Sequence, residues 1–173
     1  MYINDVIGPY IGVFIEWGFL MAFLFKLVSR LNNPDKSIVQ LCFIMAFSYM
    51  LSGAFSFSYS TYLNWFIYDL ITIFFIALWF LVIKKQRFLA LVYILLGLGL
   101  NSLLMITTHY DIYVRHNNEH WFLWTVYSYG VNIIDFLMIM ALTTEKDFFF
   151  FRKVIITPRS GYSHNIDKQP LDN

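Results

Sequence analysis

The stretch WFLWTVYSYGVNIIDFLMIMAL, from Trp121 to Leu142, decides the fold of this chain. It supplies the roughly 20 apolar residues that a helix needs to cross the hydrocarbon core of a bilayer. Two tryptophans stand near its start, and a charged run, Glu145 to Asp147, follows its end. Asn132 and Asp135 lie three residues apart in its interior and so share one helical face. Because a carboxylate at that depth is costly without a partner or a proton, we expect the other spans to surround it.

The composition of the chain is that of a membrane protein. Of the 173 residues, 59% are hydrophobic and only 13% are charged, whereas average usage includes roughly 25% charged residues. The apolar runs favour helices over a β-barrel, whose strands would alternate in segments of about ten residues. The net charge of +1 gives no indication of nucleic-acid binding, and the single cysteine, Cys42, excludes a disulfide framework.

Five apolar stretches predict an all-α, polytopic membrane helix bundle. The polar connection from Thr107 to His120 is the longest between them. A basic tail is expected at 143–173, lying in the membrane interface at 148–156 and flexible after 157. The spans are expected at about 6–28, 37–57, 65–83, 88–106 and 121–142.

The basic residues predict how the bundle is oriented. An odd number of spans places the two termini on opposite sides of the membrane. Of the 12 lysines and arginines, only Arg115 would face the side of the N-terminus. The positive-inside rule therefore predicts an N-terminus outside and a C-terminus in the cytoplasm. A bacterial inner (cytoplasmic) membrane fits this asymmetry, as several eukaryotic membranes also would.

Polar side chains inside the predicted spans are the first candidates for function. Glu16, Asp69 and Asp135 have no lysine or arginine at comparable depth, so a proton, hydrogen bonds, water or a cation must neutralise them. They either join helices to one another or line a route for protons or cations. The candidates for such a route are Glu16, Asp69, Asn101, Asn132 and Asp135.

Small residues spaced four apart are the second feature. Ser48, Ser52 and Ser56 form such a series on the second predicted span, and Gly8 and Gly12 form a pair on the first. This spacing lets helices approach closely, and hydroxyls can bond across the contact. We expect packing within the bundle or between copies, with a hydroxyl-lined pore as the alternative.

The predicted outer connection carries the third feature, a possible metal site. His116 and His120 stand four apart, which lets two imidazoles share a metal on a helix. With Glu119 they match H-x-x-E-H, which is similar to the inverted zinc-protease motif. The connection is too short for the long helix and the cleft of such an enzyme, so no enzyme is predicted. A surface loop and an external divalent-metal or pH-sensing site stay open, the latter using His109, Asp111, His116, Glu119 and His120.

Together these features favour a small non-catalytic integral membrane subunit without a required cofactor. Its expected partners are the lipid bilayer, a second copy or another membrane protein, and a cytoplasmic partner for the tail, but no nucleic acid. The alternative is a proton- or cation-conducting channel or coupled transporter that uses the intramembrane carboxylates. A membrane protein that senses external metal or pH is the lesser alternative.

Overall fold

The computed structural model describes residues 7–83, 89–117, 119 and 121–144. These residues form five long helices, each with a segment apolar and long enough to cross a membrane. No strand occurs within these described ranges, so the predicted all-α class is confirmed. The elements are α1 (Ile7–Ser29), α2 (Ser37–Ala54), α3 (Thr61–Ile83), α4 (Leu89–His109), the short π-helix η1 (Tyr110–Val114) and α5 (Phe122–Thr144).

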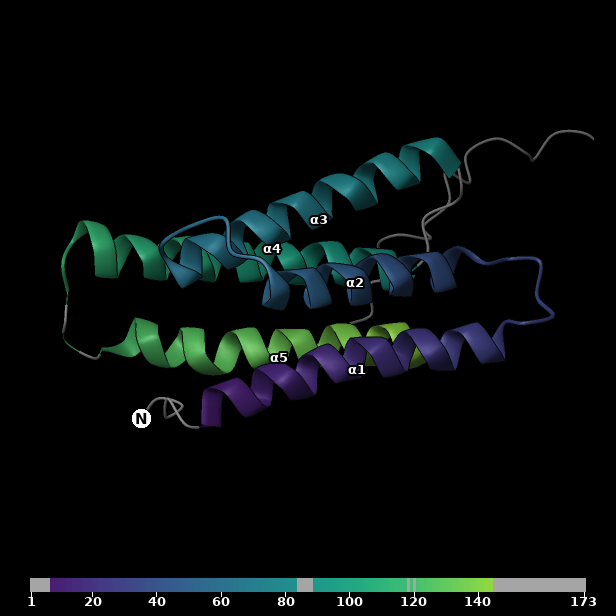
Figure 1. Cartoon of the computed structure of the whole chain (residues 1–173), viewed down its shortest axis with the longest axis horizontal. Helices are drawn as coiled ribbons and strands as arrows, with labels where there is room; N and C mark the ends of the chain where they lie inside the picture. Colours follow the sequence, from purple (N-terminus) through teal and green to yellow (C-terminus); the bar gives the residue numbers. More distant parts are fainter. Residues whose placement is uncertain (1–6, 84–88, 118, 120, 145–173) are drawn as a thin grey trace, which may run out of the picture.

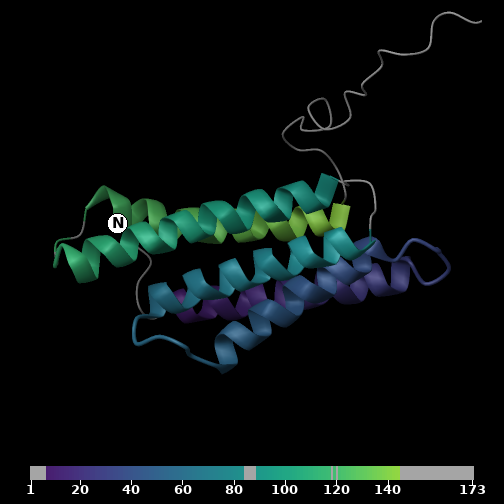
Figure 2. The same ribbon diagram turned by 90° about the horizontal axis from the view of Figure 1, so that it is seen from above.

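The helices form a ring. Each helix contacts the next in sequence, and α5 closes the ring by contacting α1. Figure 1 shows that they run alternately along the long axis, with α1, α3 and α5 starting at the same end. Seen from above, α4 and α5 lie together beside the other three helices (Figure 2). We call the end where α1 begins the N-terminal end, and the end where α5 finishes the C-terminal end.

Helix α3 begins at Thr61, four residues before the predicted start of its span at 65. Ser60 explains the difference, because its Oγ accepts a hydrogen bond from the N–H of Leu63 at 3.5 Å, as an N-cap serine does. Its carbonyl accepts the first helical hydrogen bond, from Asn64 N–H at 2.9 Å. Helix α2 ends at Ala54 rather than at 57, because Phe55 has extended backbone angles.

Helical structure also continues beyond the predicted end of the fourth span at 106. The hydroxyls of Thr107 and Thr108 donate to the carbonyls of Leu103 and Leu104, at 2.6 and 2.8 Å. Because these hydroxyls are satisfied by their own helix, the two polar residues do not end it. The predicted connection is therefore helical up to Val114. The predicted interfacial segment at 148–156 and the flexible end after 157 lie outside the described residues.

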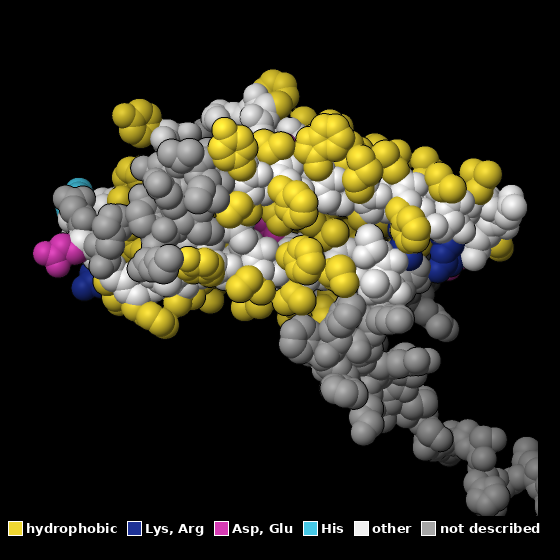
Figure 3. All heavy atoms as spheres, turned by 90° about the horizontal axis from the view of Figure 1, so that it is seen from below, with side chains coloured by type: hydrophobic (Ala, Val, Ile, Leu, Met, Phe, Trp, Pro, Cys, Tyr) yellow, Lys and Arg dark blue, Asp and Glu magenta, His cyan; other side chains and the backbone are white. Residues whose placement is uncertain are grey.

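The apolar core fills the half of the ring toward the C-terminal end. It contains fully buried side chains from the start of α2 and α4 and from the end of α5, such as Leu41, Ile94 and Leu142. On the outside, large apolar side chains are exposed on every helix, among them Phe14, Phe74 and Phe136. Figure 3 shows how these hydrophobic side chains cover one face. An apolar surface of this extent is what helices in contact with lipid present.

Candidate functional site

A cavity of about 830 Å³ lies between the helices in the half toward the N-terminal end. All five helices and η1 contribute residues to it. No lysine, arginine or histidine is among the described residues that line it. Three carboxyl groups and a series of aromatic rings dominate the lining: Glu16, Asp69 and Asp135, with Tyr49, Tyr62, Trp65, Tyr68, Tyr113, Trp124 and Tyr127.

The cavity brings together all five polar residues that the sequence suggested for an ion route. Glu16 comes from α1, Asp69 from α3, Asn101 from α4, and Asn132 and Asp135 from α5. These five residues therefore line one common space.

Asp135 joins three helices at the floor of the cavity. Its Oδ1 accepts a hydrogen bond from the hydroxyl of Tyr49 on α2 and another from Nδ2 of Asn101 on α4, both at 2.6 Å. Tyr49 is supported by the ring of Phe19, whose centroid lies 4.2 Å away. Asn132 takes no part, because its Nδ2 donates to the carbonyl of Ser128 in its own helix at 2.5 Å. The floor is therefore a fixed polar junction of α2, α4 and α5.

The wall between α2 and α3 is held by hydroxyl groups. Ser48 and Thr72 are hydrogen-bonded to each other across the two helices. Because the Thr72 hydroxyl donates its proton to the carbonyl of Tyr68 at 2.7 Å, Ser48 must be the donor in the cross-helix bond. The hydroxyl of Tyr68 lies 3.1 Å from the carbonyl of Leu51 and 3.1 Å from that of Phe55. Among the predicted small residues, Ser48 thus makes a hydrogen bond between α2 and α3.

The other predicted small residues have different surroundings. A Cβ atom added at Gly8 or Gly12 would meet nothing within 4 Å, so neither glycine lies at a close helix contact within the chain. Ser52 donates to the carbonyl of Tyr49 in its own helix at 2.8 Å. Ser56 is exposed and lies beyond the end of α2. Gly8, Gly12, Ser48 and Ser52 instead leave room in the cavity, whose lining they share.

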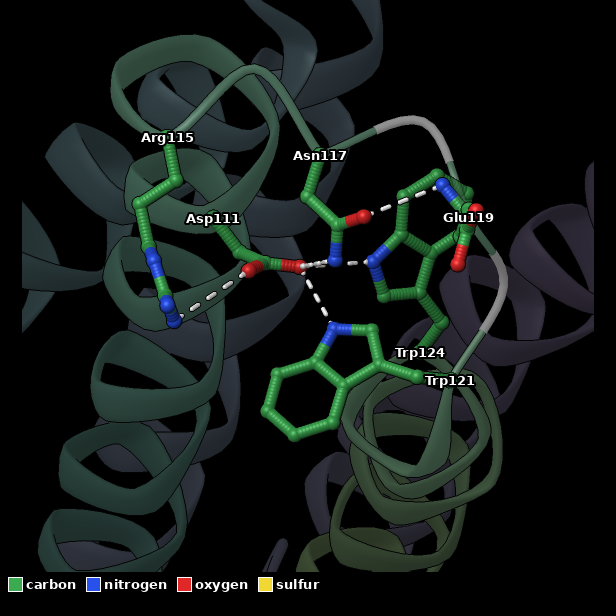
Figure 4. A network of polar contacts seen from close by, with 6 residues as sticks. All are labelled: Asp111, Arg115, Asn117, Glu119, Trp121 and Trp124. Carbon is green, nitrogen blue, oxygen red and sulfur yellow. Dashed lines mark hydrogen bonds and ion pairs between the residues drawn. The ribbon is translucent and has the colours of Figure 1, made fainter.

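Asp111 is the centre of a polar network at the N-terminal end of the bundle, as Figure 4 shows. Its Oδ2 accepts hydrogen bonds from the indole N–H of Trp121 at 2.7 Å, that of Trp124 at 3.0 Å, and Nδ2 of Asn117 at 3.1 Å. Its other oxygen lies 3.9 Å from the guanidinium of Arg115. Convergence of three N–H donors suits an ionised carboxylate. The network ties the connection after η1 to the start of α5 and fixes Trp124, which lines the cavity.

The remaining candidates for a metal site are dispersed. His109 Nδ1 lies 3.0 Å from Oγ of Ser60, and its ring stacks on Tyr113 with centroids 4.9 Å apart. His116 and Glu119 are exposed, and His120 lies outside the described residues. Within the described part of the chain, no three His, Cys, Asp or Glu side chains come together as a metal-binding group.

Sequence reasoning missed the aromatic lining and the role of Tyr49. Tryptophans and tyrosines near span ends are typical of the membrane interface. This interpretation does not predict that the same residues also line a cavity. Tyr49 carried a usable signal, because it lies well inside α2. A phenol hydroxyl at that depth needs a hydrogen-bond partner, and Asp135 provides it.

Comparison with protein-family models, with curated proteins and with solved structures finds no match for this chain. The fold and the cavity themselves therefore define the class of protein. It is a bundle of five helices, each able to cross a membrane, with an acidic and aromatic cavity at one end.

Proposed function

We propose that this protein takes up a proton or another cation in its acidic cavity and carries it across a membrane, as a transporter or as part of one. One observation carries this proposal, namely that Glu16, Asp69 and Asp135, from three different helices, line the same cavity. Carboxyl groups inside a membrane protein are costly to bury and commonly mark proton or cation pathways. With no basic side chain among the described lining residues, a proton or a cation is the natural neutralising partner.

The apolar core supports a carrier over a permanently open channel. Asp135 is the cavity residue farthest along α5, and two of the buried side chains that follow it on that helix, Met138 and Leu142, belong to the core. A solute at Asp135 is thus separated from the C-terminal end by packed apolar side chains. Carriers that expose a site to one side at a time have this arrangement of a site and a seal.

The orientation that we propose places the N-terminal end of the bundle, the half that holds the cavity, outside the cell. Lys26, Arg30 and Lys36 lie at the C-terminal end, where the positive-inside rule predicts the cytoplasm. Lys36 also stabilises the turn after α1, because its Nζ donates to the carbonyls of Arg30 and Leu31 at 3.2 and 3.0 Å. A bacterial inner membrane is the proposed location.

The role of a non-catalytic membrane subunit stays a prediction from the sequence. In such a subunit, the acidic side chains would serve only to hydrogen-bond one helix to another. Their common position around one cavity favours the carrier instead. Contacts with a second copy, with another membrane protein or with a cytoplasmic partner of the tail belong to that prediction.

Proton uptake into liposomes containing the full-length protein tests the proposal. A potassium diffusion potential drives uptake, and a trapped pH-sensitive dye reports it. The variant Asp135→Asn removes the ionisable group but keeps an Oδ1 acceptor for Tyr49 and Asn101. The matched control Asp35→Asn removes an exposed carboxyl at the other end while keeping the acceptor for the N–H of Ser37, 3.0 Å away.

We expect uptake by the wild type and by Asp35→Asn, and its loss in Asp135→Asn. Uptake that persists in Asp135→Asn would contradict the proposal. Absence of uptake in all three, with each protein monodisperse by size-exclusion chromatography, would reject proton transport and favour the subunit.

A further inference from the structure

The chemistry of the cavity identifies the class of cation that it holds. We infer that the cavity binds a protonated amine with an apolar body. Its ammonium group would lie among the carboxyl groups of the lining, beside Asp69, and its body would lie against the aromatic wall. This inference rests on the cation-binding role proposed above and goes beyond it by naming the ligand.

The size of the cavity is the first argument. A volume of about 830 Å³ falls within the roughly 300–1,000 Å³ of pockets that hold organic ligands. An inorganic cation gathers its ligands within about 2.6 Å and would use only a corner of this space. An organic cation of moderate size is the better match.

The charge of the lining is the second argument. Glu16, Asp69 and Asp135 all line the cavity, and no lysine, arginine or histidine is among its described lining residues. Carboxyl groups inside a membrane protein are costly unless a proton or a cation neutralises them. A primary ammonium group offers three N–H donors together with a positive charge.

The aromatic wall is the third argument. Tyr62 and Tyr127 meet edge to face, with ring centroids 5.3 Å apart, and both line the cavity. Trp65 and Trp124 extend this wall, the latter fixed by its hydrogen bond to Asp111. Aromatic faces attract ammonium groups and cover apolar surface, so they suit a ligand that has both.

Binding of three related probes to the wild-type protein in nanodiscs tests the inference by calorimetry. The probes are 2-phenylethylammonium, its neutral analogue 2-phenylethanol and its quaternary analogue 2-phenylethyltrimethylammonium. We expect the primary ammonium to bind roughly tenfold tighter than either analogue, because it alone combines charge with N–H donors. If the alcohol binds as tightly as the primary ammonium, the site recognises only the apolar body of the probe. If the quaternary ion binds as tightly, the N–H donors of the primary ammonium make no contribution to binding. Either result overturns the inference.

The variant Asp69→Asn supplies a second measurement, with Asp35→Asn as the control. We expect Asp69→Asn to lose at least about tenfold in affinity for the primary ammonium and to keep its weak affinity for the alcohol. Retained alcohol binding shows that the cavity is still formed, so misfolding is distinguished from loss of the charge. Unchanged amine affinity in Asp69→Asn would contradict the inference.

The transport assay separates the two proposals. Proton uptake without binding of the primary amine overturns the amine inference alone and leaves the carrier in place. Amine binding without transport of either the amine or protons keeps the inference and overturns the proposed carrier. Failure of both measurements overturns both.

Discussion

Gly97 sets how closely α4 approaches α5 beside the cavity floor. It lies four residues before Asn101, and Met138 lies three residues after Asp135, so one pair of helical faces carries both the close contact and the hydrogen bond. A Cβ atom at Gly97 would lie 2.6 Å from Cγ of Met138 and 3.3 Å from Cγ2 of Ile134. Because Met138 is only 1% exposed, it has little room to move. Gly97→Ala should therefore push the two helices apart and lengthen the bond between Asn101 and Asp135.

The expected size of the effect follows from two opposing contributions. Overpacking of a filled interior typically destabilises a protein by about 1–3 kcal/mol. Alanine in a helix is more favourable than glycine by roughly 0.5–1 kcal/mol. Gly99 is the matched control, because an added Cβ there meets nothing within 4 Å and only the second contribution remains. The difference in unfolding free energy between the two variants therefore measures overpacking alone, at about 1–3 kcal/mol.

Unfolding by sodium dodecyl sulfate in mixed micelles, followed by far-ultraviolet circular dichroism, measures this difference. Gly97→Ala should unfold at a lower mole fraction of the denaturing detergent than Gly99→Ala. It should also bind 2-phenylethylammonium more weakly, since the bond that Asn101 makes to Asp135 is weakened and the cavity lining is displaced. Equal unfolding free energies for the two alanine variants would refute the reasoning that Gly97 permits a close helix contact.

Three further predictions concern the hydrogen bonds around the cavity. Tyr49→Phe removes one of the two hydrogen-bond donors to Asp135. It should lower the unfolding free energy by about 1–3 kcal/mol and slow proton uptake. An unfolding free energy and an uptake rate equal to those of the wild type would contradict the proposed junction. Ser60→Ala removes the N-cap of α3 and should cost about 1 kcal/mol in the same unfolding titration, whereas an unchanged transition would exclude a capping role. Asp111→Ala releases the connection after η1, so trypsin should cleave after the exposed Arg115 several-fold faster in detergent; an unchanged cleavage rate would show that the network does not hold that connection.

The five helices could be predicted from sequence because long apolar runs are a local property of the chain. The helix ends were less predictable, since they depend on individual hydrogen bonds such as the N-cap at Ser60. The acidic residues could be named from the sequence, but their position around one cavity could not be predicted. The direction in which a side chain faces depends on how its helix is rotated about its axis. That rotation is set by contacts such as Gly97 against Met138, which join distant parts of the sequence. The partners of Asp111 depend on a turn between two helices, where periodicity gives no guidance.

The apolar core beyond the cavity also determines where a membrane voltage would act. The polar lining of the cavity has a higher dielectric constant than the closely packed side chains around Leu41, Ile94 and Leu142. In the proposed orientation, the voltage would therefore fall mostly across this apolar layer and much less across the cavity. A unit charge that crosses the layer gains or loses up to about 2.3 kcal/mol per 100 mV. In the proposed carrier, binding in the cavity should thus be nearly insensitive to voltage, and crossing the core should be the electrogenic step.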